Sequence, residues 1–316
     1  MKLLAAFFRL MRWPNLVFIV LTQVLFFSCI VQPAFYRQNE AAAWFLSWSS
    51  LAWLSAASVL IAAAGYIIND YFDLDIDQVN KPGNIIVQKI IKRRWAIFWH
   101  MGLSLAGVVI TFIVSYRIGN WVIGPANLAA VFLLLFYSTT FKKKFLIGNI
   151  IISLLTAWVV FVLYISELDF TVFTQQASYQ QAMTRIFKLT VLYGGFAFVI
   201  SLVREVIKDM EDLQGDEKYG CRTMPVVWGI PATKVFAGVW LTVLILSVLV
   251  LFVYAMLIHW FLAALFVLLL VVVPLVMILR KLYKAVTVVD FHRISTWIKL
   301  VMLTGIISMV FFKWHI

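Results

Sequence analysis

The chain has 316 residues, of which 64% are hydrophobic and only 13% are charged. A water-soluble domain averages about 45–50% apolar and about 25% charged residues, so this excess of apolar side chains cannot be hidden in one soluble core. The composition therefore excludes a soluble globular protein and predicts an integral membrane protein.

Nine apolar segments follow one another along the chain, and a membrane span needs roughly 20 such residues. Because backbone groups in lipid must be hydrogen-bonded within the protein, we expect helices; the strands of a barrel would show an alternating pattern instead. The predicted spans are 13–32, 43–68, 95–116, 121–138, 145–166, 186–206, 233–256, 259–279 and 294–312. The prediction is an all-α membrane protein, with one domain (1–316) and nine transmembrane helices in a single bundle.

Lys and Arg are divided unevenly between the two sides that these spans define. With nine spans, 21 of the 26 Lys and Arg residues fall on the side of the N-terminus, whereas Arg37, Arg117 and three others fall on the opposite side. Basic residues collect on the cytoplasmic side of membrane proteins, so the bias predicts a cytoplasmic N-terminus, in a cell inner membrane. It also accounts for the net charge of +12, which therefore does not indicate nucleic-acid binding.

Acidic residues are concentrated in two of the loops on the predicted cytoplasmic side, 69–94 and 207–232, and at the helix end before the second loop. Ten of the 14 Asp and Glu residues lie there, and each loop contains the spacing D-x-x-D-x-x-x-D. The second copy follows the first by 139 residues. On a helix this spacing places three carboxylates on one face. The six residues are Asp70, Asp73, Asp77, Asp209, Asp212 and Asp216.

Three carboxylates on one helix face repel each other unless a cation holds them. Mg²⁺ prefers oxygen ligands and commonly binds one or two carboxylates together with phosphate oxygens, so the two motifs are predicted to clamp a diphosphate through Mg²⁺. Nearby basic residues are suited to contact the diphosphate directly. They are Lys81, Lys142–Lys144, Lys208 and Arg222.

Two non-enzymatic interpretations fit the acidic motifs less well. Solvated caps at helix ends would explain one D-x-x-D, but they do not explain two copies of a longer motif on the same side of the membrane. A cation-coupled transporter would also use carboxylates, but transport sites usually lie near the membrane midplane, whereas these aspartates lie at its surface.

The motifs resemble those of the UbiA superfamily of intramembrane prenyltransferases. Residues 69–77 have the form N-D-x-x-D-x-x-x-D and precede Asn80-Lys81-Pro82; the second motif, 209–216, precedes Arg222-Thr223-Met224-Pro225. Arg12-Trp13-Pro14-Asn15 resembles the family's R-x-x-N on the first helix. Tyr137 with Lys142–Lys144 resembles a loop whose tyrosine and lysine touch the diphosphate.

This resemblance implies that the protein binds a polyprenyl diphosphate in a cavity open to lipid. Mg²⁺ held by the six aspartates would assist ionisation of the allylic C–O bond, and an acceptor would capture the carbocation. The residues that the resemblance assigns to substrate binding are Asn15, Asn69, Lys81, Tyr137, Lys142, Arg204, Lys208 and Arg222. Asp75 and Glu211 lie off the shared helix face, so we expect their replacement to matter less. No role is predicted for the histidines.

Residues 204–216 look most like the digeranylgeranylglyceryl phosphate synthase branch, which adds a geranylgeranyl group to geranylgeranylglyceryl phosphate. Basic residues around the second motif would then hold the phosphate of the acceptor, and Glu205 or an aspartate would take the proton of the reacting hydroxyl. Members that prenylate aromatic acceptors (hydroxybenzoate or dihydroxynaphthoate) in quinone biosynthesis share the aspartates and are the nearest alternative.

Overall fold

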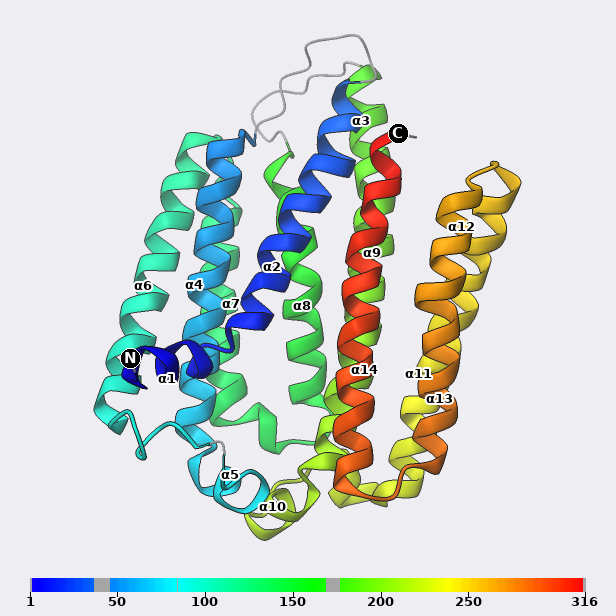
Figure 1. The fold of residues 1–316 in the computed structure, drawn as a ribbon. Helices are drawn as coiled ribbons and strands as arrows, with labels where there is room; N and C mark the ends of the chain where they lie inside the picture. Colours follow the sequence, from blue (N-terminus) through cyan, green and yellow to red (C-terminus); the bar gives the residue numbers. More distant parts are fainter. Residues whose placement is uncertain (1, 37–45, 84, 169–176, 315–316) are drawn as a thin grey trace. The chain divides into compact units, whose positions relative to one another are not determined.

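The computed structural model describes residues 2–36, 46–83, 85–168 and 177–314. Within these ranges every named secondary-structure element is a helix, which confirms the all-α prediction (Figure 1). Arg37 and the first residues of the predicted second span, 43–45, lie outside the described residues.

The helices are α1 (Lys2–Leu10), α2 (Trp13–Phe26), η1 (Phe27–Val31), α3 (Gln32–Tyr36), α4 (Trp48–Phe72), α5 (Leu74–Asn80), α6 (Arg93–Arg117), α7 (Ile123–Thr139), η2 (Phe141–Lys143), α8 (Ile147–Ser166), α9 (Ala177–Glu211), α10 (Leu213–Lys218), α11 (Met224–Leu257), α12 (Phe261–Val267), η3 (Leu268–Val272), α13 (Val273–Lys284), α14 (Val288–Ile307) and η4 (Ser308–Trp314).

Eight helical segments of the described chain are long and apolar enough to cross a membrane, so the protein is an integral, multi-pass membrane protein. The predicted fourth span corresponds to α7, an apolar helix of only 17 residues, and a ninth crossing stays a prediction. The predicted sixth span ends too early, because α9 continues from 206 to Glu211. Its last turns contain Lys and Glu, which are good helix formers, so charge alone does not end the helix.

The chain divides into two compact units, and each contains one acidic motif. Unit 1 consists of Met1–Phe141 and Trp158–Leu192, and unit 2 of Lys142–Ala157 and Tyr193–His315. Helices α8 and α9 each contribute residues to both units.

In unit 1, α4 packs against α2, α6 and α7 (Figure 1). Helices α4 and α6 approach closely at Gly107 of α6, where an added Cβ would lie 3.1 Å from the carbonyl oxygen of Ala57. The short α1 packs Ala6 and Leu10 against Ile67 of α4. The N-terminal helix is thereby fixed beside the end of α4 that carries the first acidic motif.

In unit 2, the apolar faces of α9, α11, α13 and α14 form one core. Met210, in the last turn of α9, belongs to this core and is 2% exposed, so the second acidic motif starts from a firmly packed helix end. Helix α11 is kinked, because Gly229 has a φ of 77° and Pro231 cannot donate a backbone hydrogen bond.

Two prolines inside membrane spans distort their helices in the same way. Pro33 and Pro274 follow π-helical turns, Phe27–Val31 and Leu268–Val272 respectively. A proline ring clashes with the carbonyl group four residues earlier and offers it no N–H. In both spans that carbonyl lies inside the π turn, whose wider spacing relieves the clash.

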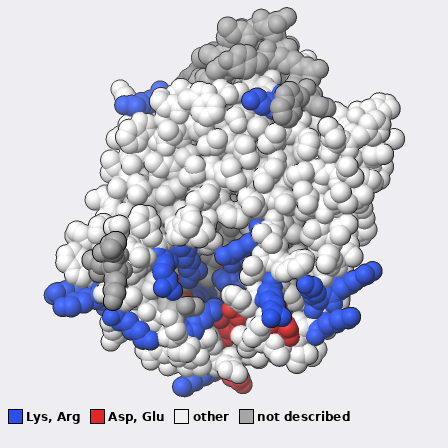
Figure 2. Space-filling model, in the orientation of Figure 1, with Lys and Arg blue, Asp and Glu red and all other residues white. Residues whose placement is uncertain are grey.

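Within each unit, Lys and Arg side chains gather near the helix ends where the acidic motif lies (Figure 2). In unit 1 they include Lys81 and Arg93, at the ends of α5 and α6. In unit 2 they include Lys218 and Lys281, in the last turns of α10 and α13. Each unit taken by itself therefore has the charge bias from which the orientation was predicted.

The close approach of α4 and α6 gives a test of the packing in unit 1. We expect Gly107→Ala to lower the apparent melting temperature in detergent by several degrees, because overpacking typically costs about 1–3 kcal/mol. Gly102→Ala is the matched control, since nothing lies within 4 Å of a Cβ at that position of α6. Equal stability of the two variants would contradict the α4–α6 contact.

Candidate functional site

Both acidic motifs cross a break between a long helix and a short one. Helix α4 gives way to α5 at Asp73, and α9 gives way to α10 at Asp212. The prediction that each triplet lies on one face of a continuous helix is therefore wrong. The first aspartate is in the long helix, the second is the junction residue, and the third is in the short helix.

The two breaks have the same backbone geometry. Asp73 has φ −85° and ψ −2°, and Asp212 has φ −94° and ψ 7°. The N–H of Asp77 donates to the carbonyl of Asp73 at 2.8 Å, and the N–H of Asp216 donates to the carbonyl of Asp212 at 3.2 Å. The repeat in the sequence is thus also a repeat of local structure.

Asp70, the first carboxylate of the first motif, is paired with Arg12. Nη2 of Arg12 lies 2.7 Å from Oδ1 of Asp70, and the guanidinium lies 5.2 Å from the centre of the Tyr66 ring, one turn earlier on α4. Arg12 joins α1 to α2 with φ 51° and ψ 50°, a left-handed conformation that residues other than glycine rarely adopt. Burial lowers the pKa of Arg12, but the charge of Asp70, the hydrogen bond to it and the neighbouring Tyr66 and Asp73 together raise this pKa above its ordinary value.

Asp73 is held by the residue that precedes the motif's first aspartate. Nδ2 of Asn69 donates to Oδ2 of Asp73 at 2.6 Å, as expected if the amide assists this cluster. The Asp73 residue is 4% exposed, whereas Asp75, two residues later in α5, is exposed. The smaller importance expected for Asp75 stays a prediction.

In the second motif, the partners of the aspartates come from α8 and from the start of α11. Nδ2 of Asn149, in the first turn of α8, donates to Oδ2 of Asp209 at 2.8 Å. Oγ1 of Thr223 donates to Oδ2 of Asp216 at 3.2 Å. Asn149 and Asp216 are both buried, so these bonds lie inside the protein rather than on its surface.

Two further acidic residues near the second motif have basic partners. Glu205 accepts hydrogen bonds from Arg204 at 2.8 Å and from Lys208 at 3.1 Å, so these two cations flank a carboxylate of their own helix. Glu211 is 8% exposed, and its Oε1 lies 3.0 Å from Nδ1 of His292 on α14. Glu211 is thus an internal, partnered residue, and His292 belongs to the surroundings of the motif.

The remaining predicted substrate-binding residues lie at helix ends in one unit or the other. In unit 1, Asn15 donates its backbone N–H to the carbonyl of Arg12 at 2.8 Å, Lys81 caps α5, and Tyr137 lies near the end of α7. In unit 2, Lys142 lies in η2. The N–H of Arg222 donates to the carbonyl of Lys143 at 2.8 Å, which brings the lysine loop beside the segment after the second motif.

The oxygen atoms around the first motif suit a hard cation. Oδ1 of Asn69 is buried and has no hydrogen-bond partner among the described residues, and it belongs to the side chain that holds Asp73. Such an amide oxygen is a ligand type that Mg²⁺ accepts. The described residues contain no group of three or more His, Cys, Asp or Glu side chains able to hold a metal by themselves. Mg²⁺ commonly binds one or two carboxylates together with water and phosphate oxygens.

Comparison with known proteins places the chain in a family. The pattern of the UbiA prenyltransferase family matches residues 6–299. The chain belongs to this family. The digeranylgeranylglyceryl phosphate synthase of Methanosphaera stadtmanae is 31% identical over 177 residues, which are 56% of this chain and 57% of the relative. The enzyme of the same name from Haloquadratum walsbyi is 36% identical over 195 residues, which are 61% of this chain and 60% of the relative. Both matches span less than two thirds of the relative's length.

The fold is also that of solved UbiA proteins. The structure of a UbiA homolog from Archaeoglobus fulgidus bound to DMAPP and Mg²⁺ superposes with a TM-score of 0.57, at 16% sequence identity. The superposition covers 96% of this chain and 98% of that chain, so the UbiA fold extends over nearly the whole protein.

Sequence reasoning assigned no partner to four residues that hold the acidic groups of the motifs: Arg12, Asn149, Thr223 and His292. Arg12 and Thr223 were quoted only as parts of motifs that resemble those of the family. Asn149 is a single amide in an apolar segment, which is a weak signal on its own. Nothing in the sequence indicates that His292 meets Glu211.

The Arg12–Asp70 pair can be tested by a double-mutant cycle. We expect Arg12→Gln to lower the apparent melting temperature, because it leaves the partly buried Asp70 carboxylate without its cation. In the Arg12→Gln/Asp70→Asn double variant the two effects should not add, with a coupling of about 1–2 kcal/mol. Arg9→Gln, an exposed position on α1, is the control. Strict additivity would show that the pair does not stabilise the protein.

Proposed function

We propose that this protein is a Mg²⁺-dependent prenyltransferase that moves a geranylgeranyl group from its diphosphate to geranylgeranylglyceryl phosphate. The observation that carries the proposal is the duplicated motif. Two segments 139 residues apart share the spacing, the helix break and the internally bonded aspartates. Membership of the UbiA prenyltransferase family supports the reaction class.

In this reaction the bond between C1 of the prenyl group and the diphosphate oxygen breaks, and its electron pair leaves with the diphosphate. An ether bond forms between C1 and the hydroxyl oxygen of the acceptor, which loses its proton. Mg²⁺, when bound, supplies positive charge that stabilises the departing diphosphate. We assign its ligands to Asp70, Asp73 and Asp77, assisted by Asn69, and to Asp209, Asp212 and Asp216.

The side chains assigned to the diphosphate are those that the resemblance indicated. They are Asn15, Lys81, Tyr137, Lys142 and Arg222. Arg204 and Lys208 share Glu205 as a partner and thus form one basic group, which we assign to the phosphate of the acceptor. Because Glu205 is held between these two cations, we assign the proton of the reacting hydroxyl to an aspartate instead.

The identity of the acceptor rests on the relatives rather than on the geometry. Both relatives compared above bear the name digeranylgeranylglyceryl phosphate synthase. A glycerol-phosphate acceptor reacts through a hydroxyl and carries its own phosphate, which accounts for basic residues in excess of those that one diphosphate requires. An aromatic acceptor would need fewer cations and is the alternative that the assay below distinguishes.

The reaction gives a direct prediction for purified protein. Geranylgeranyl diphosphate should be consumed with geranylgeranylglyceryl phosphate in the presence of Mg²⁺, and not with hydroxybenzoate or dihydroxynaphthoate. Asp73→Ala and Asp212→Ala should lower kcat by roughly a hundredfold or more, because each removes a group that stabilises the leaving charge. Asp75→Ala, the exposed neighbour on α5, is the matched control and should stay within a few-fold of the wild type. If only the aromatic acceptors give a product, the proposed acceptor is wrong and the protein is an aromatic-acceptor prenyltransferase of quinone biosynthesis.

We further propose that the protein is a single UbiA-like domain, 1–316, with nine spans and a cytoplasmic N-terminus. Loops 69–94 and 207–232 would then both face the cytoplasm, as the positive charge around them requires. Single cysteines placed at Asn80 and Lys218 should be labelled by a membrane-impermeant thiol reagent only after the membrane is opened. Each new cysteine is introduced into a variant from which the two native cysteines, Cys29 and Cys221, have been removed, so that only the new position can react. Labelling of the two positions from opposite sides would overturn the topology.

A further inference from the structure

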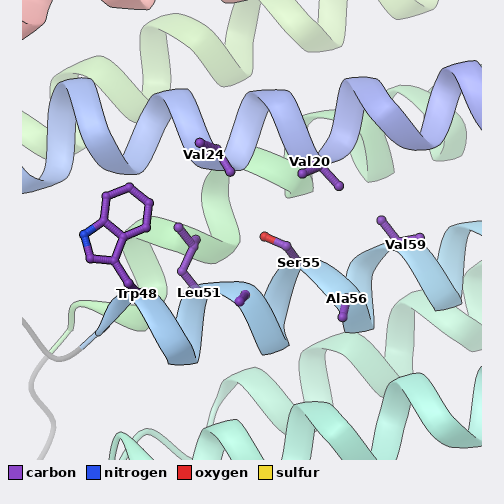
Figure 3. Close-up of a pocket in the computed structure, with 8 residues that line it drawn as sticks. Val20, Val24, Trp48, Leu51, Ser55, Ala56 and Val59 are labelled. Carbon is purple, nitrogen blue, oxygen red and sulfur yellow. The ribbon is translucent and has the colours of Figure 1, made fainter.

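A groove runs between α2 and α4 in unit 1 (Figure 3). It consists of two adjoining hollows, of about 370 and 470 Å³, which share Val20, Val24 and Val59 in their walls. We call this continuous feature the α2–α4 groove. One hollow reaches Trp48 at the start of α4, and the other reaches Trp13 at the start of α2.

The groove exists because α4 presents small side chains where α2 presents valines. Ala52, Ser55 and Ala56 of α4 line the groove together with Val20 and Val24 of α2, and their small side chains leave space between the helices. Both helices belong to segments able to span a membrane, so the medium around the groove is hydrocarbon. An occupant must therefore be a hydrocarbon chain rather than a polar molecule.

Ser55 contributes a hydroxyl that points from α4 toward α2 (Figure 3). Its Oγ is buried and has no hydrogen-bond partner among the described residues. Ser58 of α4 and Thr22 of α2 behave differently, since each donates to the carbonyl group four residues earlier. This hydroxyl lies beneath the surface of the groove, so the wall that an occupant meets is apolar.

The groove leads to the candidate functional site. Trp13 lines one end, and the adjacent Arg12 is bonded to Asp70 of the first acidic motif. From Trp13 to Val24 the rise along α2 is about 16 Å, roughly half of the hydrocarbon thickness of a bilayer. A chain in the groove would thus have its polar end near Asp70 and its tail toward Trp48.

We propose that the α2–α4 groove holds the isoprenoid chain of the acceptor lipid; this rests on the proposed function. The first isoprene unit of the donor becomes a cation, which must be kept from water and from competing nucleophiles. The chain of the acceptor takes no part in the bond changes and does not need such enclosure. The groove is open along its side, where Val17 and Val20 are 50% and 39% exposed, so it suits a spectator chain that enters from the bilayer.

Lipid tails are as apolar as the walls of the groove, so leaving the bilayer for the groove gains little transfer free energy. The groove therefore orients the acceptor, and the headgroup of the acceptor supplies most of its affinity for the protein. Filling the groove should accordingly weaken acceptor use by a moderate factor rather than abolish it.

The test compares variants that fill the groove with a variant of the same kind elsewhere. Val20→Phe and Ala56→Phe place a ring in or beside the groove, and Val109→Phe, at an exposed position of α6, is the control. We expect the first two to raise KM for geranylgeranylglyceryl phosphate about fivefold or more. KM for geranylgeranyl diphosphate, and KM for an acceptor with a five-carbon ether chain, should not change.

Each other outcome has a definite meaning. An increase in KM for the diphosphate would place the donor chain in the groove, and unchanged constants throughout would leave the groove to bulk lipid; either result overturns the proposal. If the wild type does not prenylate the ether acceptor at all, the proposed function fails separately. Binding of geranylgeranylglyceryl phosphate to the wild type and to Val20→Phe in nanodiscs then decides about the groove, which is rejected if both bind equally.

Discussion

Carboxylates at the end of an apolar helix need partners, because a buried charge without a counter-charge or hydrogen bond is costly. This requirement governs the structure around both acidic motifs. Asp70 is bonded to Arg12, Asp209 to Asn149 and Asp216 to Thr223, and in each case the partner is outside the aspartate's own helix. The helices that frame the motifs are therefore tied to them by their polar side chains as well as by apolar packing.

The two motifs have the same backbone geometry but differ in the charge of the residues that bind their first aspartates. Arg12 removes one unit of negative charge from the first motif, whereas Asn149 is neutral and removes none from the second. The cations nearest to the second motif on α9, Arg204 and Lys208, already donate to Glu205. The first aspartate therefore has a charged partner in one motif and a neutral partner in the other, despite their common spacing.

The class of fold and the positions of the motifs follow from local patterns, namely long apolar segments and a repeated acidic spacing. The helix breaks at Asp73 and Asp212 were not predictable, because neither glycine nor proline marks them and the flanking Leu74 and Leu213 fit a continuing helix. The Arg12–Asp70 and Asn149–Asp209 pairs join residues 58 and 60 positions apart. Such pairs depend on which helices are neighbours, and apolar periodicity does not determine this.

Helix α2 connects the polar and apolar parts of unit 1. Its start is set by Arg12, whose left-handed backbone turns the chain from α1 and whose guanidinium holds Asp70. The next residue, Trp13, lines the end of the groove between α2 and α4. A change in the angle of α2 would therefore alter the Arg12–Asp70 bond and the width of the groove together. Since Arg12 is held by a strained backbone as well as by an ion pair, the two features keep a fixed relation that a flexible surface lysine would not provide.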